Sequence, residues 1–241
     1  YIYKKCNTIL YSSKGFKESI ESRGAPTSKL AYFPNWVEPT DMVESPLPVI
    51  LPSGFKVLFA GNIGASQDFE TILCAAEQLK KIKDLHWVIL GDGREFEWVK
   101  SQVLLRDLSS NFHLLGRFPA SDMPSFFSMS DVLLVTLKPE PAFEVTIPGK
   151  LQAYLASGKP IVAALDGEGA RLVEEAKAGI AVSAGNAKML ADSVFRLYQT
   201  PAPERAAMGQ RGKSYCEKNF SRESALEKIK GCLLTANIEN H

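Results

Sequence analysis

Short runs of consecutive apolar residues alternate along most of this chain with longer stretches in which apolar residues recur every three or four positions. The short runs predict strands, and the longer stretches predict helices that bury one face. The helical spacing is clear at Phe69, Ile72, Leu73, Ala76 and Leu79. Strands are predicted at 56–60, 86–90, 111–115, 131–136, 160–164 and 179–182. Helices are predicted at 69–81, 95–108, 124–129, 148–157, 168–178, 188–198 and 221–234.

Several of these strands lack polar residues at alternate positions, as strands that are buried on both faces do. Strands that alternate with helices form a parallel sheet covered on both sides. We therefore expect an α/β fold with a Rossmann-like, doubly wound parallel sheet. Such sheets bind ligands at the carboxyl ends of their strands. That rule places the segments 61–64, 91–93, 116–117 and 138–150 at one rim.

The first fifty residues follow a different pattern. A strand is predicted at 7–12 and a helix at 14–23, and the segment 34–52 with its five prolines indicates an extended connector. One strand and one helix cannot form a sheet alone. This unit either joins an edge of the main sheet or belongs to another domain, so we divide the chain into residues 1–50 and 51–241.

Composition narrows the choice of partner and compartment. The 241 residues include 28 Lys and Arg against 27 Asp and Glu, a net charge of +1, and nucleic-acid binding usually needs a basic excess. An apolar content of 45% excludes disorder, and no apolar run reaches the ~18 residues of a membrane span. The chain starts at Tyr1 without a signal-peptide pattern, and we expect it to be a piece whose true start lies upstream.

Cysteine and histidine spacing gives no metal site. The four cysteines form no C-x-x-C pair and the three histidines are scattered, so we expect reduced thiols in the cytosol.

Two motifs at the predicted rim suit an anion. Gly61-Asn62-Ile63-Gly64 follows a strand and precedes a helix, the context of a phosphate-binding turn, although a plain tight turn fits equally well. Further along, Pro148 suits the first turn of a helix, Gly149 clears its start, and Lys150 adds a full charge there. This start suits a diphosphate. The alternative is a surface loop with incidental polar residues.

The wider sequence around Lys150 resembles a known family. Glu144 and Gln152 are separated by seven residues, and the helix continues as Lys150-Leu-Gln-Ala-Tyr-Leu-Ala-Ser-Gly-Lys-Pro-Ile161. With Phe59-Ala-Gly-Asn-Ile-Gly64, Val88-Ile-Leu-Gly-Asp-Gly93, Leu115-Gly-Arg-Phe118 and Met129-Ser-Asp-Val-Leu-Leu134, this resembles the carboxyl-terminal half of a retaining, GT-B-fold glycosyltransferase of family 4. Thr146-Ile-Pro and Leu165-Asp-Gly-Glu-Gly169 are most similar to bacterial enzymes that build surface polysaccharides.

The resemblance implies transfer of a sugar from a UDP-sugar to an acceptor hydroxyl. Residues 51–241 would be the donor-binding domain, and residues 1–50 the tail of an acceptor-side domain plus linker. Glu144 would be the catalytic residue that holds the sugar. The donor would further contact Gly61, Asn62, Gly64, Gly116, Arg117, Thr146, Ile147, Gly149, Lys150 and Gln152. Gln152 replaces the family's second glutamate at the ribose, where its amide oxygen still accepts one hydrogen bond.

The resemblance also implies partners and absences. The acceptor would be a saccharide or a lipid-linked saccharide, and without the missing N-terminal domain the chain is expected to bind donor and not to transfer. No metal and no cofactor besides the donor are expected, because no D-x-D triplet occurs. Location is expected to be cytoplasmic, at the inner face of the membrane for the intact enzyme.

Three alternatives stay open. A Rossmann oxidoreductase would need a G-x-G-x-x-G turn, which residues 61–64 do not match. A GT-B UDP-sugar epimerase would act without an acceptor, and a non-catalytic module would bind nucleotide sugar alone.

Overall fold

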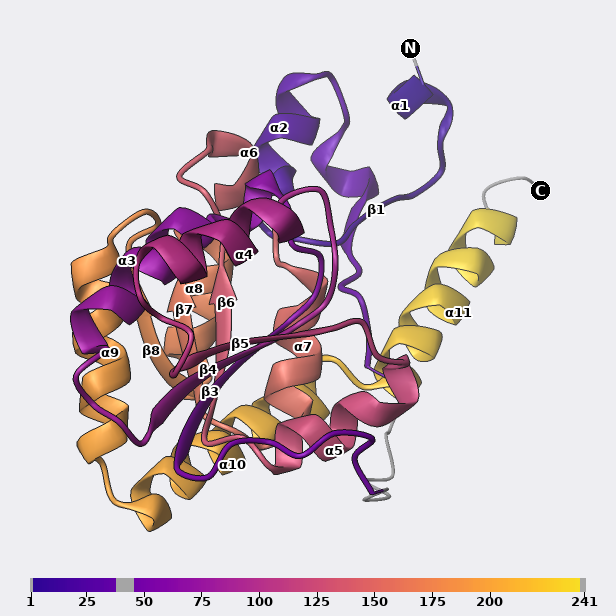
Figure 1. The fold of residues 1–241 in the computed structure, drawn as a ribbon. Coiled ribbons are helices and arrows are strands. Elements are labelled where there is room, and N and C mark those ends of the chain that lie inside the picture. The colour runs from indigo at the N-terminus through magenta and orange to yellow at the C-terminus, as the bar shows by residue number, and fades with distance from the viewer. Residues whose placement is uncertain (1, 38–45, 239–241) are drawn as a thin grey trace.

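The computed structural model describes residues 2–37 and 46–238, and it has the expected α/β architecture (Figure 1). Its main sheet contains six parallel strands in the order β5-β4-β3-β6-β7-β8. The strands are β3 (Phe55–Ala60), β4 (Leu85–Leu90), β5 (Phe112–Gly116), β6 (Val132–Thr136), β7 (Ile161–Ala164) and β8 (Gly179–Val182). The order reverses between β3 and β6, and doubly wound sheets bind their ligands at such a switch point.

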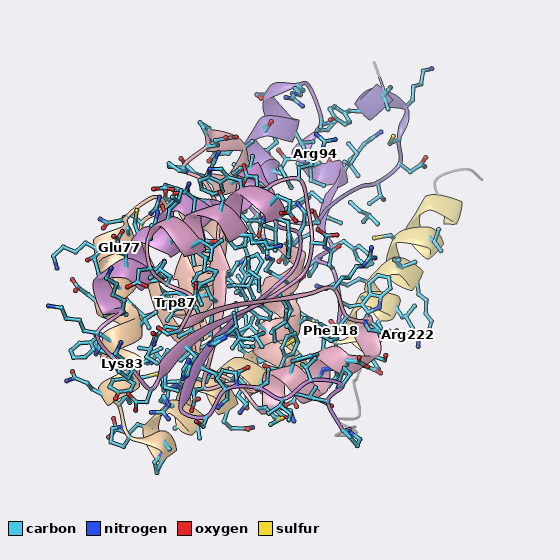
Figure 2. The ribbon with its side chains drawn as sticks, in the orientation of Figure 1. Glu77, Lys83, Trp87, Arg94, Phe118 and Arg222 are labelled. Atoms are coloured by element: carbon cyan, nitrogen blue, oxygen red, sulfur yellow. The ribbon has the colours of Figure 1, made fainter. Side chains whose placement is uncertain are left out.

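Helices cover both faces of the sheet (Figure 1). The helices α3 (Phe69–Leu79), α4 (Phe96–Leu105) and α9 (Ala187–Gln199) form one hydrophobic cluster with the strands. The other cluster contains residues of α5 (Met123–Ser128), α7 (Gly149–Ala156), α8 (Gly167–Glu175) and α10 (Ala202–Asn219). Trp87 of β4 lies in the first cluster, and Figure 2 shows it inside the molecule, with Glu77 of α3 further out.

The N-terminal segment does not join the main sheet. Its elements are α1 (Ile2–Lys5), β1 (Ile9–Tyr11), α2 (Phe16–Ser22) and β2 (Leu30–Tyr32). Strand β1 pairs in parallel with β2, which the sequence pattern did not reveal, and the two strands make a separate sheet. Of the two possibilities left by the sequence, joining an edge of the main sheet is therefore wrong.

Two segments that are distant in sequence meet where this N-terminal part ends. Val37 forms a parallel bridge with Ser221, and its N–H donates to the carbonyl of Phe220 at 3.0 Å. Ser221 directly precedes α11 (Arg222–Ile238), which runs back beside the N-terminal elements (Figure 1). No helix in the described part of the chain is both long and apolar enough to cross a membrane.

The structure contains helices that apolar periodicity did not predict. Besides α1, these are α6 (Pro141–Glu144), which lies within the predicted loop 138–150, and the whole of α10. The buried residues of α10 are Gly209, Gly212 and Cys216. The helix therefore packs through small residues and lacks the stripe of large apolar side chains from which a helix is predicted. A side chain at 209 would begin 1.8 Å from the carbonyl oxygen of Gly158, which shows how closely two backbones pack there.

Candidate functional site

The predicted rim consists of three neighbouring turns that follow β3, β4 and β5. The N–H of Gly61 donates to the carbonyl of Leu90 at 2.9 Å, and the N–H of Gly91 donates to the carbonyl of Gly116 at 2.8 Å. Gly91 has φ 138°, and a Cβ there would lie 1.8 Å from the carbonyl oxygen of Gly61. The structure therefore brings Gly61 and Gly116 to one edge, as the sequence predicted.

Some N–H groups of the glycine turn already donate hydrogen bonds within the protein. Besides Gly61, Ile63 donates its N–H to the carbonyl of Asp92 at 2.8 Å. Asn62 is exposed, and Gly64 accommodates its side chain amide. A 3-10 turn, Ala65–Gln67, follows Gly64, so α3 begins only at Phe69. A phosphate-binding role for this turn stays a prediction, with fewer free N–H groups than the sequence suggested.

Lys150 lies at the switch point of the sheet. It occupies the first turn of α7, and its Nζ is 2.6 Å from Gln67 Oε1 and 3.8 Å from the ring centre of Phe59. Gly61 leaves room for this ammonium, because a Cβ at 61 would lie 2.8 Å from Nζ. Burial lowers the pKa of Lys150 to about 7. A proton on this side chain is therefore easily gained or lost near neutral pH.

The position of Lys150 depends on how α7 is attached to β3. Tyr154 is fully buried, and its hydroxyl accepts the N–H of Ala60 at 2.9 Å and donates to the carbonyl of Ala60 at 3.3 Å. Leu151 and Leu155 pack into the apolar cluster on the same face of the sheet. These contacts hold α7 against the sheet, with Tyr154 at the carboxyl end of β3.

Gln67 is a site residue that the sequence analysis missed. Its carbonyl accepts a hydrogen bond from the Thr136 hydroxyl at the end of β6. The Lys138 N–H donates to the carbonyl of the preceding residue, Ser66, at 3.0 Å. The turn that carries Gln67 is therefore attached by hydrogen bonds to the end of β6 and to the loop that follows it. Its place directly after the glycine turn was the available signal, but a lone glutamine at that place indicates no chemistry.

Glu144 and its neighbours form the loop before α7. Glu144 ends α6 with an exposed side chain, and Gly167 packs so closely that its Cβ would lie 1.9 Å from the Glu144 carbonyl oxygen. The Thr146 hydroxyl donates to the carbonyl of Ala142 at 2.9 Å, and Ile147 packs against the apolar cluster. Gly149 is exposed at the helix start. Glu144 is thus an exposed carboxylate in the segment that leads into α7.

Gln152 lies apart from that group. It is 3% exposed, and its Nε2 donates to the carbonyl of Asn35 at 3.1 Å. Residues two apart on a helix point about 200° from each other, so Gln152 and Lys150 face different sides of α7. The structure places Gln152 against the N-terminal segment, and its ribose role stays a prediction.

The predicted donor contacts Gly116 and Arg117 lie at the end of β5 and directly after it. Arg117 is exposed, and Phe118 packs against Phe126 of α5 with ring centres 4.8 Å apart, on the α5 side of the molecule in Figure 2. No cluster of three or more potential metal ligands occurs among residues 2–37 and 46–238.

Comparison with known proteins identifies the family. Residues 50–215 match the model described as "Glycosyl transferases group 1". The chain belongs to this family. This glycosyltransferase chain is 26% identical to probable glycosyltransferase WbjE of Pseudomonas aeruginosa. The match covers 97% of this chain and 59% of WbjE. Putative colanic acid biosynthesis glycosyl transferase WcaI of Escherichia coli is 30% identical over 63% of this chain and 39% of WcaI. The chain thus matches less than two thirds of these relatives' length.

Solved structures confirm the fold. The Anabaena protein Alr3699/HepE in complex with UDP superposes with a TM-score of 0.79 at 17% identity, covering 97% of this chain and 65% of that one. Sucrose-phosphate synthase from Thermosynechococcus elongatus gives a TM-score of 0.81 at 16% identity, covering 100% and 60%. The parallel sheet and its flanking helices match GT-B glycosyltransferase structures.

Proposed function

We propose that this chain is the donor-binding half of a retaining glycosyltransferase that takes a UDP-sugar and transfers the sugar to a saccharide or lipid-linked saccharide acceptor. The observation that carries the proposal is Lys150, held beside the glycine turn at the switch point of the sheet. A diphosphate there would meet the Lys150 ammonium and the N–H groups that begin α7.

The same groups would assist the reaction. Breaking the bond between the sugar and UDP leaves negative charge on the diphosphate. A lysine and oriented N–H groups that are already in place stabilise such charge more in the transition state than in the ground state. Glu144, exposed in the loop that leads to this helix, would hold the hydroxyl groups of the transferred sugar.

Several relatives support the choice of donor and product. Alr3699/HepE was crystallised with UDP and with UDP-glucose. WcaI is named for colanic acid biosynthesis, and a relative from Niallia circulans is a 2-deoxystreptamine N-acetyl-D-glucosaminyltransferase. By analogy we propose a UDP-activated sugar and a role in surface polysaccharide synthesis. We also propose that no metal acts at the donor site, because the sequence contains no D-x-D triplet.

Titration calorimetry tests the ligand. The chain is titrated with UDP, UDP-GlcNAc, GDP and NAD at pH 6.5. We expect binding of UDP and UDP-GlcNAc, weaker binding of GDP, and none of NAD. Tighter binding of NAD than of both uridine ligands would contradict the proposal. UDP-GlcNAc that yields free UDP and an epimerised sugar in the absence of acceptor would identify an epimerase instead.

A further inference from the structure

Gln67 is held rigidly at the switch point. Its carbonyl accepts from Thr136, its N–H donates to the carbonyl of Gly64 at 2.9 Å, and Ser66 accepts from Lys138. These bonds come from β6, from the glycine turn and from the loop beyond β6. The side chain of Gln67 therefore projects from a fixed backbone, and its Oε1 lies 2.6 Å from Lys150 Nζ.

Lys150 gains its position through that contact. A lysine has a flexible stem and three hydrogen-bond donors at its end. Among the residues that the structure describes, Gln67 is the side chain to which the Lys150 ammonium donates, while the Phe59 ring lies on another side at 3.8 Å. The remaining donors would serve a diphosphate bound at the rim.

We propose that Gln67 is a positioning residue, which holds the Lys150 ammonium at the carboxyl end of β3 so that it meets the diphosphate of the nucleotide. The inference rests on the proposed function and adds a residue outside the recognised motif. Without this contact the lysine stem would have to be ordered by the ligand itself, and binding would weaken accordingly.

The neutrality of Gln67 matters as much as its reach. A carboxylate at 67 would form an ion pair with Lys150 and would repel the incoming diphosphate. An amide oxygen accepts the same hydrogen bond and leaves the positive charge available to the ligand. Among the described residues, burial alone lowers the pKa of Lys150, and no charged neighbour adds to it. Because the amide of Gln67 is neutral, an anionic ligand can still change the protonation of Lys150.

Calorimetric UDP affinities of the wild type, Q67M, K150M and the double variant test this coupling. Methionine matches glutamine in length and accepts no comparable hydrogen bond. We expect Q67M to weaken UDP binding up to about tenfold, because the ligand must then order the lysine side chain itself. In the K150M background the same substitution should change the affinity less than twofold. An equal loss in both backgrounds, or no loss in either, would overturn the inference.

The charge argument has its own variants. Q67E should weaken UDP binding more than Q67M does and should move the pH midpoint of UDP affinity upward, because a carboxylate favours the charged lysine. Q78E, which adds the same charge at an exposed position on α3, should change the affinity less than twofold. Q67E that binds UDP as tightly as the wild type would overturn the inference.

The controls separate this inference from the proposed function. Thermal unfolding checks that each variant folds, and if Q67M does not, Q67A, which also lacks the amide oxygen that accepts from Lys150, carries the same test. A wild-type chain that binds neither UDP nor a UDP-sugar would overturn the proposed function and this inference with it. Wild-type binding that Q67M and Q67E leave intact would overturn this inference alone.

Discussion

At the scale of single residues, the site depends on a lysine in surroundings that do not favour its charge. Lys150 packs against Phe59 and is neutralised by no carboxylate among the described residues, and burial brings its pKa to about 7. An anionic ligand reverses this balance, because a nearby negative charge favours the ammonium. Ligand binding and proton binding are therefore linked at this residue.

The first prediction is the pH dependence of UDP affinity. Below pH 7 Lys150 is charged before the ligand arrives, and above pH 7 binding must first add a proton. We expect the affinity to fall as pH rises from 6 to 8.5, by up to tenfold for each pH unit above the pKa of Lys150. Calorimetry across this range measures it. K150R, whose guanidinium stays charged, should flatten the profile, and an unchanged slope in K150R would contradict the assignment.

The second prediction separates Glu144 from Gln152. E144A should weaken UDP-sugar binding and leave UDP binding nearly intact, because its carboxylate is assigned to the sugar. E140A removes a carboxylate from the same exposed loop and serves as the control. Comparative titration with UDP and UDP-GlcNAc gives both affinities. Equal weakening of UDP and UDP-sugar by E144A would mean that the roles are misassigned.

For Gln152 the outcome decides between two roles. If it contacts the ribose, Q152A should weaken both ligands alike, by about 0.5–1.5 kcal/mol. If it serves only the contact with Asn35 at 3.1 Å, both affinities should stay unchanged and the free energy of unfolding should fall.

At the scale of elements, the junction between α7 and β3 positions the site. The third prediction is that Y154F lowers the free energy of unfolding by about 1–3 kcal/mol, because the buried Ala60 N–H loses its acceptor. Denaturant unfolding with an unchanged m-value measures it. Y215F removes a hydroxyl whose 2.9 Å bond to Glu175 lies at the surface, and it should cost less than about 1 kcal/mol. Similar costs for both variants would contradict the role of Tyr154.

Sequence patterns predicted the elements that bury large apolar side chains. All six strands of the main sheet and helices such as α3 were found within a few residues of their ends. Helix α10 was missed because small residues make its contacts, and β2 because its three residues gain their identity only by pairing with β1. Patterns along the chain contain no information on backbone approach or on a distant pairing partner.

The site was predictable to a similar degree. The rim and the place of Lys150 follow from sheet topology, which strand and helix patterns supply. The partner of Lys150 could not be predicted in this way, because Gln67 lies 83 residues away in sequence and carries no charge that would indicate a contact with a lysine. Helical spacing alone already separates Gln152 from Lys150, yet the motif pairs it with Glu144, and only the structure places it against Asn35.

At the scale of the whole molecule, the chain consists of a large sheet with two covered faces and a small one with little cover. Two parallel strands alone bury too little surface to be stable. The fourth prediction is that amides of β1 and β2 exchange with deuterium much faster than those of β3 and β4 in this chain. Hydrogen-exchange mass spectrometry compares them. Equal protection would show that α2 and α11 stabilise the small sheet sufficiently.

The pairing of Ala60 with Tyr154 also affects how the protein emerges from the ribosome. These residues are 94 positions apart, and at about 5–20 residues per second the tyrosine is added about 5–20 s after the alanine. During that interval α3 and α4 can already pack on one face of β3, β4 and β5. The other face, which contains Leu58 and Val88, still lacks α7. The nascent chain therefore carries an uncovered apolar surface on the side where Tyr154 later packs, and a chaperone that binds such surfaces would meet it there first.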